Sequence, residues 1–160
     1  MGQVSKIKAV DLFPFISELI EGGKSARILV SGSSMTPFLR DQTDSVEFSK
    51  VSFTDIARGD IVLIQRVDGA YVMHRVYRKR RDCFYIIGDA QEWIEGPLNP
   101  DQLVALVTAI WRKDKRIPCS NLVWRLLCKL WLYLRPFRYF IFRVYGFLRR
   151  RIKRIKKSSK

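Results

Sequence analysis

Residues 59–77, GDIVLIQRVDGAYVMHRVY, carry the strongest fold signal in the sequence. Two runs of β-branched and aromatic residues flank the dipeptide Asp68–Gly69. An Asp-Gly pair suits the positive φ angles of a type I′ turn, which joins neighbouring strands through a two-residue loop. The stretch therefore predicts a β-hairpin.

A two-residue loop also fixes which side chains of the hairpin share a face. Counting outward from Asp68–Gly69 places Leu63 opposite His74, the single histidine of the chain. This register predicts that His74 lies on one face of the sheet together with the apolar side chains of Ile61, Leu63, Val72 and Val76.

Other segments extend this hairpin into a mainly β fold. Short runs with strand character cover residues 26–32, 44–48, 83–89 and 103–112, and a polar loop is expected over 90–102. Asp11 can cap a short helix over residues 12–23. We therefore expect a small, coiled, mixed β-sheet or partly open barrel, with a short N-terminal helix and amphipathic C-terminal helices.

The charge is concentrated at the C-terminal end. The 160 residues include 30 Lys or Arg and 15 Asp or Glu, a net charge of +15. Residues 117–160 contain thirteen of the basic residues and no acidic residue, so residues 1–116 are nearly neutral. This pattern predicts three parts: an N-terminal helical segment (1–25), a β domain (26–116) and a basic amphipathic tail (117–160).

The tail combines this charge with apolar and aromatic side chains at helical spacing. At 100° per residue, one broad face holds Trp124, Leu126, Leu127, Leu130, Trp131 and Leu134, with Arg125 and Lys129 opposite. Pro136 is expected to kink or restart the helix. No uncharged apolar run approaches the roughly 18–20 residues that a spanning helix needs. We expect the tail to lie on an anionic membrane surface, through Trp124, Arg125, Lys129, Trp131, Arg138, Arg149 and Lys153. The alternatives are a solvated basic extension or a helical cap that packs on the sheet.

Three cysteines, without CxxC spacing or a neighbouring histidine, do not predict a metal site or a disulfide framework, and no cofactor motif is present. The N-terminus lacks the pattern of a secretory signal. These features favour a cytoplasmic protein, peripheral at the inner face of a bacterial cell membrane.

One constellation of residues could carry chemistry. A serine hydroxyl becomes a useful nucleophile when a nearby base removes its proton, and histidine titrates in the right range. Residues 30–39, VSGSSMTPFL, supply three serines, and the expected hairpin supplies His74. A carboxylate that accepts the other ring N–H would orient the imidazole. Asp89 ends the next expected strand, and Glu92 and Glu95 follow it.

Four segments in this order resemble the signal peptidase I superfamily of serine peptidases, which includes the SOS-type repressor autopeptidases. They are SGSSMTPFL (31–39), RGDIVLIQ (58–65), YVMHRV (71–76) and YIIGDAQ (85–91). Histidine followed by Arg-Val is similar to the endoplasmic-reticulum, archaeal and sporulation branch, in which histidine replaces the usual lysine base. The layout is most similar to small stand-alone bacterial members. One departure is Asp44, which lacks the glycine that usually precedes it.

The resemblance implies a partly open β-barrel and an acyl-enzyme mechanism without a cofactor or metal. It assigns the nucleophile to Ser34, the serine before methionine, and the base to His74. It leaves two candidates for the acid of the catalytic triad: Asp89, which we favour, and Glu95. Gly32, Ser33, Met35 and Pro37 are expected to shape the oxyanion site and the groove for an extended peptide or precursor protein.

The sequence is also compatible with two functions other than catalysis. A chain of this fold could bind peptides without cleaving them. Alternatively, the basic tail could contact the phosphates of a nucleic acid. The second reading also requires a basic patch on the β domain, and residues 1–116 are almost neutral. A peptidase that acts on a peptide or precursor protein at a membrane surface is the preferred prediction.

Overall fold

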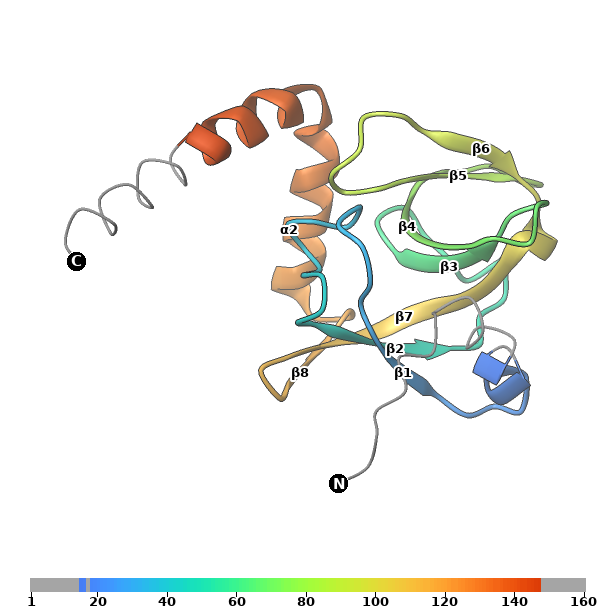
Figure 1. Ribbon diagram of the computed structural model, residues 1–160. Helices are drawn as coiled ribbons and strands as arrows, with labels where there is room; N and C mark the ends of the chain where they lie inside the picture. Colours follow the sequence, from blue (N-terminus) through green and yellow to red (C-terminus); the bar gives the residue numbers. More distant parts are fainter. Residues whose placement is uncertain (1–14, 17, 148–160) are drawn as a thin grey trace.

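The computed structural model describes residues 15, 16 and 18–147, shown in Figure 1. Residues 15, 16 and 18–21 are helical, which agrees with part of the helix expected over 12–23; positions 12–14 and 17 lie outside the described residues. The later elements are β1 (Ala26–Leu29), β2 (Ser45–Ser49), β3 (Ile61–Gln65), β4 (Tyr71–Lys79), β5 (Phe84–Ile87), β6 (Glu95–Leu98), the 3₁₀ turn η1 (Pro100–Gln102), β7 (Leu103–Arg112), β8 (Lys115–Pro118), α2 (Leu122–Tyr133), η2 (Arg135–Phe137) and a helix over residues 138–147.

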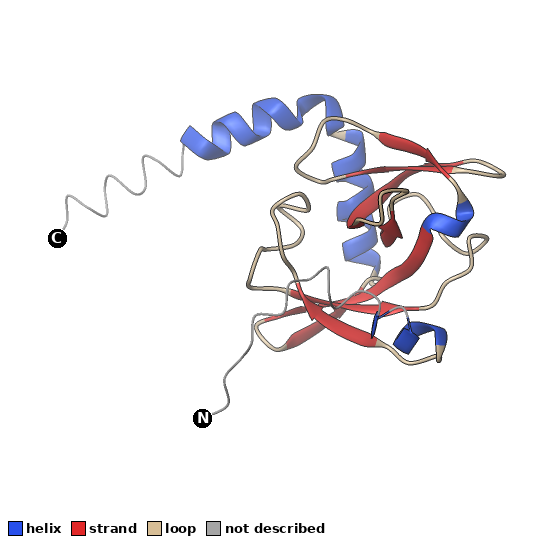
Figure 2. Cartoon of the chain, turned by 45° about the vertical axis from the view of Figure 1, so that its right-hand side comes forward, coloured by secondary structure: helices blue, strands red, loops and turns tan. Residues whose placement is uncertain are grey.

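The strands form one open, strongly curved sheet in the order β1-β2-β7-β3-β4-β5-β6, and β8 pairs with β7 (Figures 1 and 2). The long strand β7 joins the two halves because it pairs with both β2 and β3. The mainly β fold is confirmed. A mixed sheet was expected, whereas every strand pair among the described residues is antiparallel.

The hairpin at residues 59–77 forms, but the expected register is wrong by one residue. The Gly69 N–H donates to the Arg66 carbonyl and the Arg66 N–H donates to the Ala70 carbonyl, so the loop has three residues. Gly69 alone takes the positive φ, +82°, which is typical of a type I turn followed by a bulge. As a result Val62, and not Leu63, lies opposite His74.

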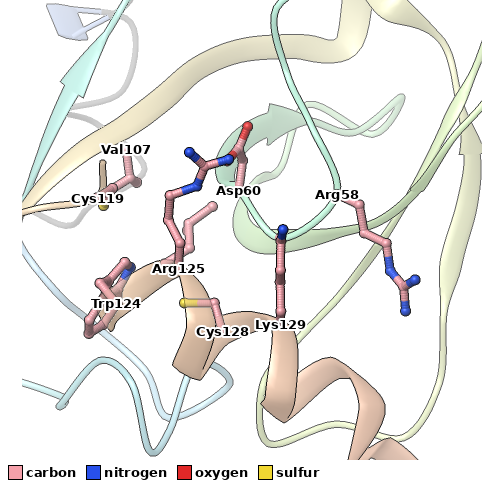
Figure 3. A pocket seen from close by; sticks show the side chains of 10 residues that line it. Arg58, Asp60, Val107, Cys119, Trp124, Arg125, Cys128 and Lys129 are labelled. Atoms are coloured by element: carbon pink, nitrogen blue, oxygen red, sulfur yellow. The ribbon is translucent and has the colours of Figure 1, made fainter. Parts of the chain in front are cut away.

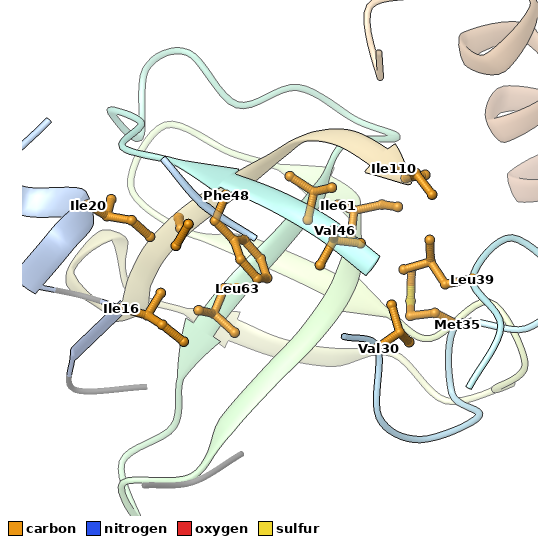
Figure 4. Packing of buried hydrophobic residues seen from close by; sticks show 13 residues of the cluster. Ile16, Ile20, Val30, Met35, Leu39, Val46, Phe48, Ile61, Leu63 and Ile110 are labelled. Carbon is orange, nitrogen blue, oxygen red and sulfur yellow. The ribbon is translucent and has the colours of Figure 1, made fainter. Parts of the chain in front are cut away.

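This shift moves His74 to the other face of the sheet, because side chains alternate along a strand. His74 lies on the face that carries Val62 and Ile64 of β3, not on the face of Ile61 and Leu63. The two faces build separate cores. One, shown in Figure 4, includes Val30, Met35, Leu39, Phe48, Ile61 and Leu63, and the other includes Val62, Ile64, Val76, Phe84 and Ile86.

The C-terminal segment packs on the β domain. Figures 1 and 2 show α2 running along the sheet, and the helix over 138–147 extending away from the strands after the break at Pro136. The expected break at Pro136 is therefore confirmed. The expectation that Trp131 and Arg138 contact a membrane surface is wrong for these two residues, because both side chains are buried. Arg149 and Lys153 lie outside the described residues.

Two strands were missed by the sequence patterns. The edge strand β6 forms within the segment expected to be a loop, and β8 spans the expected boundary between the β domain and the tail at residues 116 and 117. Both are four residues long and both contain proline, a residue that removes a backbone donor and is confined to the edges of sheets. They therefore carry almost no strand signal of their own.

Candidate active site

The loop between β1 and β2, residues 30–44, is fixed at its base by two carboxylates. Asp41 accepts a hydrogen bond from the Gly32 N–H at 2.9 Å, with Gly32 at a φ of +97°. Asp44 is buried and accepts hydrogen bonds from the Arg40 N–H and the Arg112 guanidinium. Gly32 is thus required by its backbone conformation, and its N–H is not available to an oxyanion.

The loop sets the Ser34 main chain against the end of β5. The Ala90 N–H donates to the Ser34 carbonyl at 2.8 Å. A Cβ atom on Gly88 would lie only 2.9 Å from the same oxygen, so glycine permits this close approach. Gly88 directly follows Ile87, the last β5 residue, which pairs with Arg75. The Ser34 main chain therefore lies next to the end of β5, whose last residue pairs with Arg75, the residue after His74. His74 itself does not line the cavity beside Ser34.

A cavity of about 150 Å³ opens beside Ser34. Its lining consists of one segment from the serine loop and one from β4: Val30, Ser31, Gly32, Ser34, Met35, Tyr71, Val72 and Met73. Of the residues expected to shape a groove, Gly32 and Met35 line this cavity, whereas Ser33 and Pro37 do not. The cavity lies alongside the part of β4 that precedes its pairing with β5 at Arg75.

His74 is buried, with 3% of its surface exposed. Its Nδ1 atom lies 4.0 Å from Oε2 of Glu95 and has no hydrogen-bond partner among the described residues. Burial lowers the pKa of His74 to about 4, and the Glu95 carboxylate offsets only part of this effect. The imidazole is therefore neutral at pH 7, the form that can accept a proton.

Glu95 reaches His74 from the edge strand β6, where it pairs with Ile86 of β5. The Arg66 guanidinium donates to both of its carboxylate oxygens, at 2.5 and 2.6 Å. These hydrogen bonds lower the pKa of Glu95, so the carboxylate stays charged at neutral pH. A fixed anion near Nδ1 can stabilise an imidazolium when one forms.

Asp89, the acid that the sequence favoured, is engaged elsewhere. Both of its carboxylate oxygens accept hydrogen bonds from the buried Arg75 guanidinium, at 2.8 and 2.7 Å, and both side chains are fully buried. Arg75 also donates to the Gly59 carbonyl and lies over the Phe38 ring. Successive residues of a strand point to opposite faces, so Arg75 directs Asp89 away from the face of His74. The geometry favours Glu95 as the acid beside the histidine.

The state of His74 predicts a pH dependence of stability. Its pKa is about 4 in the folded chain and about 6.5 in the unfolded chain. Between these values the unfolded chain binds the extra proton, so stability falls as pH decreases from about 6.5 to about 4. We expect a loss of about 2–4 kcal/mol, since one pKa unit corresponds to about 1.4 kcal/mol.

Chemical denaturation of the wild type and His74→Gln at pH 7 and pH 4.5 measures this effect. Carboxylates other than Glu95 contribute equally in both proteins, and the pKa of Glu95 depends mainly on Arg66, so the difference between the two pH slopes reports mainly on the histidine. Parallel slopes would contradict the assignment of a buried, neutral His74.

Side chains from the C-terminal segment brace the turn at residues 88–91. The Trp131 indole donates to the Asp89 carbonyl at 3.0 Å, and Arg138 donates to the Gly88 carbonyl at 3.1 Å. The Phe38 ring of the serine loop packs against Trp131, with 5.9 Å between ring centroids. The sequence patterns placed Trp131 and Arg138 at a membrane and did not identify this role. The only sequence signal for this role was the spacing of seven residues between Trp131 and Arg138, which can place both side chains on the same side of the C-terminal segment.

The structure holds the residues of a candidate nucleophilic site, but it shows no hydrogen bond between the nucleophile and the base. Neither the Ser34 hydroxyl nor Nδ1 of His74 forms a hydrogen bond with a described residue, and the N–H groups of Ser34 and Met35 also donate to no described residue. In residues 15, 16 and 18–147, no group of three or more side chains is arranged to hold a metal ion. Comparisons with protein-family models, with curated proteins and with solved structures find no match to this chain.

Proposed function

We propose that this protein is a serine peptidase in which Ser34 is the nucleophile, His74 the general base and Glu95 the carboxylate that orients the histidine. The observation that carries the proposal is the meeting of the serine loop and β4 at the turn of residues 88–90, beside an open cavity. The resemblance of the four sequence segments to the signal peptidase I superfamily assigns Ser34 and His74 to the same two roles.

The mechanism follows from these positions. The Ser34 hydroxyl attacks the carbonyl carbon of a peptide bond while its proton passes to the imidazole of His74. The carbonyl oxygen becomes an oxyanion, which the N–H groups of Ser34 and Met35 can stabilise. The imidazolium returns the proton to the leaving amine, and water then hydrolyses the acyl-enzyme. Catalytic hydrogen bonds are often long in ligand-free proteins and shorten when substrate binds.

An extended peptide is the substrate that the cavity suits best. The β4 segment from Tyr71 to Met73 precedes the pairing with β5 and lines one wall of the cavity, and the serine loop lines the other. A peptide strand between these walls can add main-chain hydrogen bonds to β4, the common mode of peptide recognition at a sheet. Val30, Val72 and two methionines line the cavity together with the serines, which favours small or apolar side chains next to the cleaved bond.

A fluorophosphonate probe tests the proposal without knowledge of the natural substrate. We expect covalent labelling of the wild type, and a loss of at least about a hundredfold in the labelling rate of Ser34→Ala. Ser33→Ala is the matched control, because Ser33 is the adjacent serine and is exposed outside the cavity. Intact-mass spectrometry reads out each adduct.

Equal labelling of the wild type and Ser34→Ala would remove Ser34 as the nucleophile. A folded wild type that takes up no probe would instead support a peptide-binding module on the same fold. The missing hydrogen bond between Ser34 and His74 is the observation that favours this second function.

A further inference from the structure

The outward side of α2 is apolar and unusually exposed. Six large residues lie within an arc of about 140° around the helix, at 100° per residue. Their exposed fractions range from 49% to 70%. We call this set the outer face of α2: Leu122, Val123, Leu126, Leu127, Leu130 and Tyr133. Exposed apolar patches of this kind in a folded protein usually mark an interaction site.

The exposed apolar surface continues past the break at Pro136. Phe137, Tyr139, Phe140, Val144 and Tyr145 all have more than two-fifths of their surface exposed. Figure 1 shows that the helix carrying most of them leaves the β domain, so the strands do not cover it. The opposite side of α2 is already used, because Cys128, Trp131 and Leu132 are buried against the domain.

Positive charges lie along the flank of this surface. Arg125 and Lys129 project from one side of α2, beside a small cavity of about 30 Å³ that Arg58 and Asp60 also line (Figure 3). The outer face of α2 itself carries no charged residue. The whole segment 117–160 holds thirteen basic residues and no acidic residue.

We propose that the outer face of α2 binds in the interfacial region of an anionic lipid bilayer, with the helix lying parallel to the membrane. A helix with an apolar face and Lys or Arg at its boundary buries the apolar side chains at the level of the acyl chains and leaves the charges among the headgroups. No helix among the described residues has the length and hydropathy to cross a bilayer. The inner side of α2 supports the turn beside Ser34, so binding would hold the candidate active site roughly one helix diameter, ~10–12 Å, above the membrane.

Charge complementarity favours a bilayer over the other possible occupants. A symmetric contact between two copies would place two segments of thirteen positive charges together, with no acidic side chain in either segment to compensate. A nucleic acid offers phosphates to the basic residues, but it offers nothing that would cover six exposed apolar side chains. Anionic lipids supply both the negative charge and an apolar layer.

Sedimentation of the full chain with vesicles tests this proposal, and its readout is independent of peptidase activity. We expect binding to vesicles of phosphatidylcholine and phosphatidylglycerol that is at least about tenfold stronger than binding to phosphatidylcholine alone. Leu126→Ser and Leu130→Ser are each expected to weaken binding by about tenfold or more, because each removes a buried leucine side chain from the lipid contact.

Val67→Ser is the matched control and should bind like the wild type. Val67 is 97% exposed at the tip of the β3–β4 loop, so it is an exposed apolar residue that is not part of the outer face. Circular dichroism of the four proteins verifies that α2 stays folded, since serine costs an exposed helix only a few tenths of a kcal/mol.

Three results would overturn the proposal. Unchanged binding of Leu126→Ser and Leu130→Ser would mean that the charge of the tail acts alone. If the wild type does not bind vesicles but forms a dimer, and either substitution converts this dimer to monomers, the outer face of α2 is a contact between two copies. Binding to duplex DNA but not to anionic vesicles would assign the basic segment to nucleic acid.

Discussion

Replacement of Arg75 by methionine is expected to lower the free energy of unfolding by about 3–5 kcal/mol. Methionine fills much of the arginine volume but leaves the Asp89 carboxylate charged and buried without a partner. Burial alone would lower the pKa of Arg75, yet the Asp89 carboxylate raises it above its ordinary value, so the buried guanidinium stays charged. The loss is large relative to the total stability of a typical domain, about 5–15 kcal/mol.

Urea denaturation of wild type and Arg75→Met measures the effect, with Arg116→Met as the matched control. Arg116 also binds a carboxylate, that of Glu47, at 2.8 Å, but its side chain is exposed to solvent. Exposed ion pairs contribute little to stability because water screens them, so the control should be nearly neutral. The double variant Arg75→Met with Asp89→Leu removes both charges and should recover much of the stability.

A similar, small loss in Arg75→Met and Arg116→Met would contradict the role of the buried pair. It would also reopen the possibility that Asp89 is available to His74. Persistent instability of the double variant would show that the arginine contributes through its contacts with Gly59 and Phe38, and not through the charge of Asp89.

The second large effect is expected for Glu95→Gln, which should slow fluorophosphonate labelling of Ser34 by about 10²–10⁴-fold. This range follows from replacement of the acid in serine peptidases, where an amide no longer stabilises the imidazolium or the correct tautomer. Glutamine keeps the size of the side chain, and Arg66 is partly exposed to solvent, so the fold should be retained.

Glu47→Gln is the matched control for this experiment. Glu47 is another partly buried glutamate that binds an arginine through both oxygens, and it lies on β2. Its replacement should leave the labelling rate unchanged. If Glu95→Gln is labelled at the wild-type rate, Glu95 is not the orienting acid. This conclusion holds even if the Ser34→Ala variant shows that Ser34 is the nucleophile.

The strands themselves were largely predictable from the sequence. The final long strand, β7, has the bounds that its apolar pattern predicted, and the break at Pro136 forms as expected. The hairpin at residues 59–77 also forms, although its register differs by one residue from the expected one. In each case the signal is local: β-branched residues favour strands, glycine permits positive φ angles and proline cannot continue a helix. The short proline-containing strands β6 and β8 have no such signal and depend on their neighbours.

The candidate site was only partly predictable. The resemblance to the signal peptidase I superfamily, and not the residue pattern alone, selected Ser34 and His74, and it left two acids. The structure brings Glu95 to 4.0 Å from His74 and pairs Asp89 with Arg75. This outcome depends on β6 adding to the edge of the sheet next to β5. Such a contact between distant segments cannot be read from the spacing of residues along the chain.

Sequence alone determined the β class of the domain, the concentration of positive charge after residue 117 and the residue types available for nucleophilic chemistry. Tertiary structure decided which side of each element those residues occupy. A single extra residue in the loop before Ala70 places His74 on the other face of the sheet, because side chains in a strand alternate with a period of two. Likewise, packing of the C-terminal segment on the domain buried Trp131 of α2 and Arg138 of the next helix and left Leu126 and Leu130 exposed. An apolar helix can bury either side, and only the surface it meets selects one.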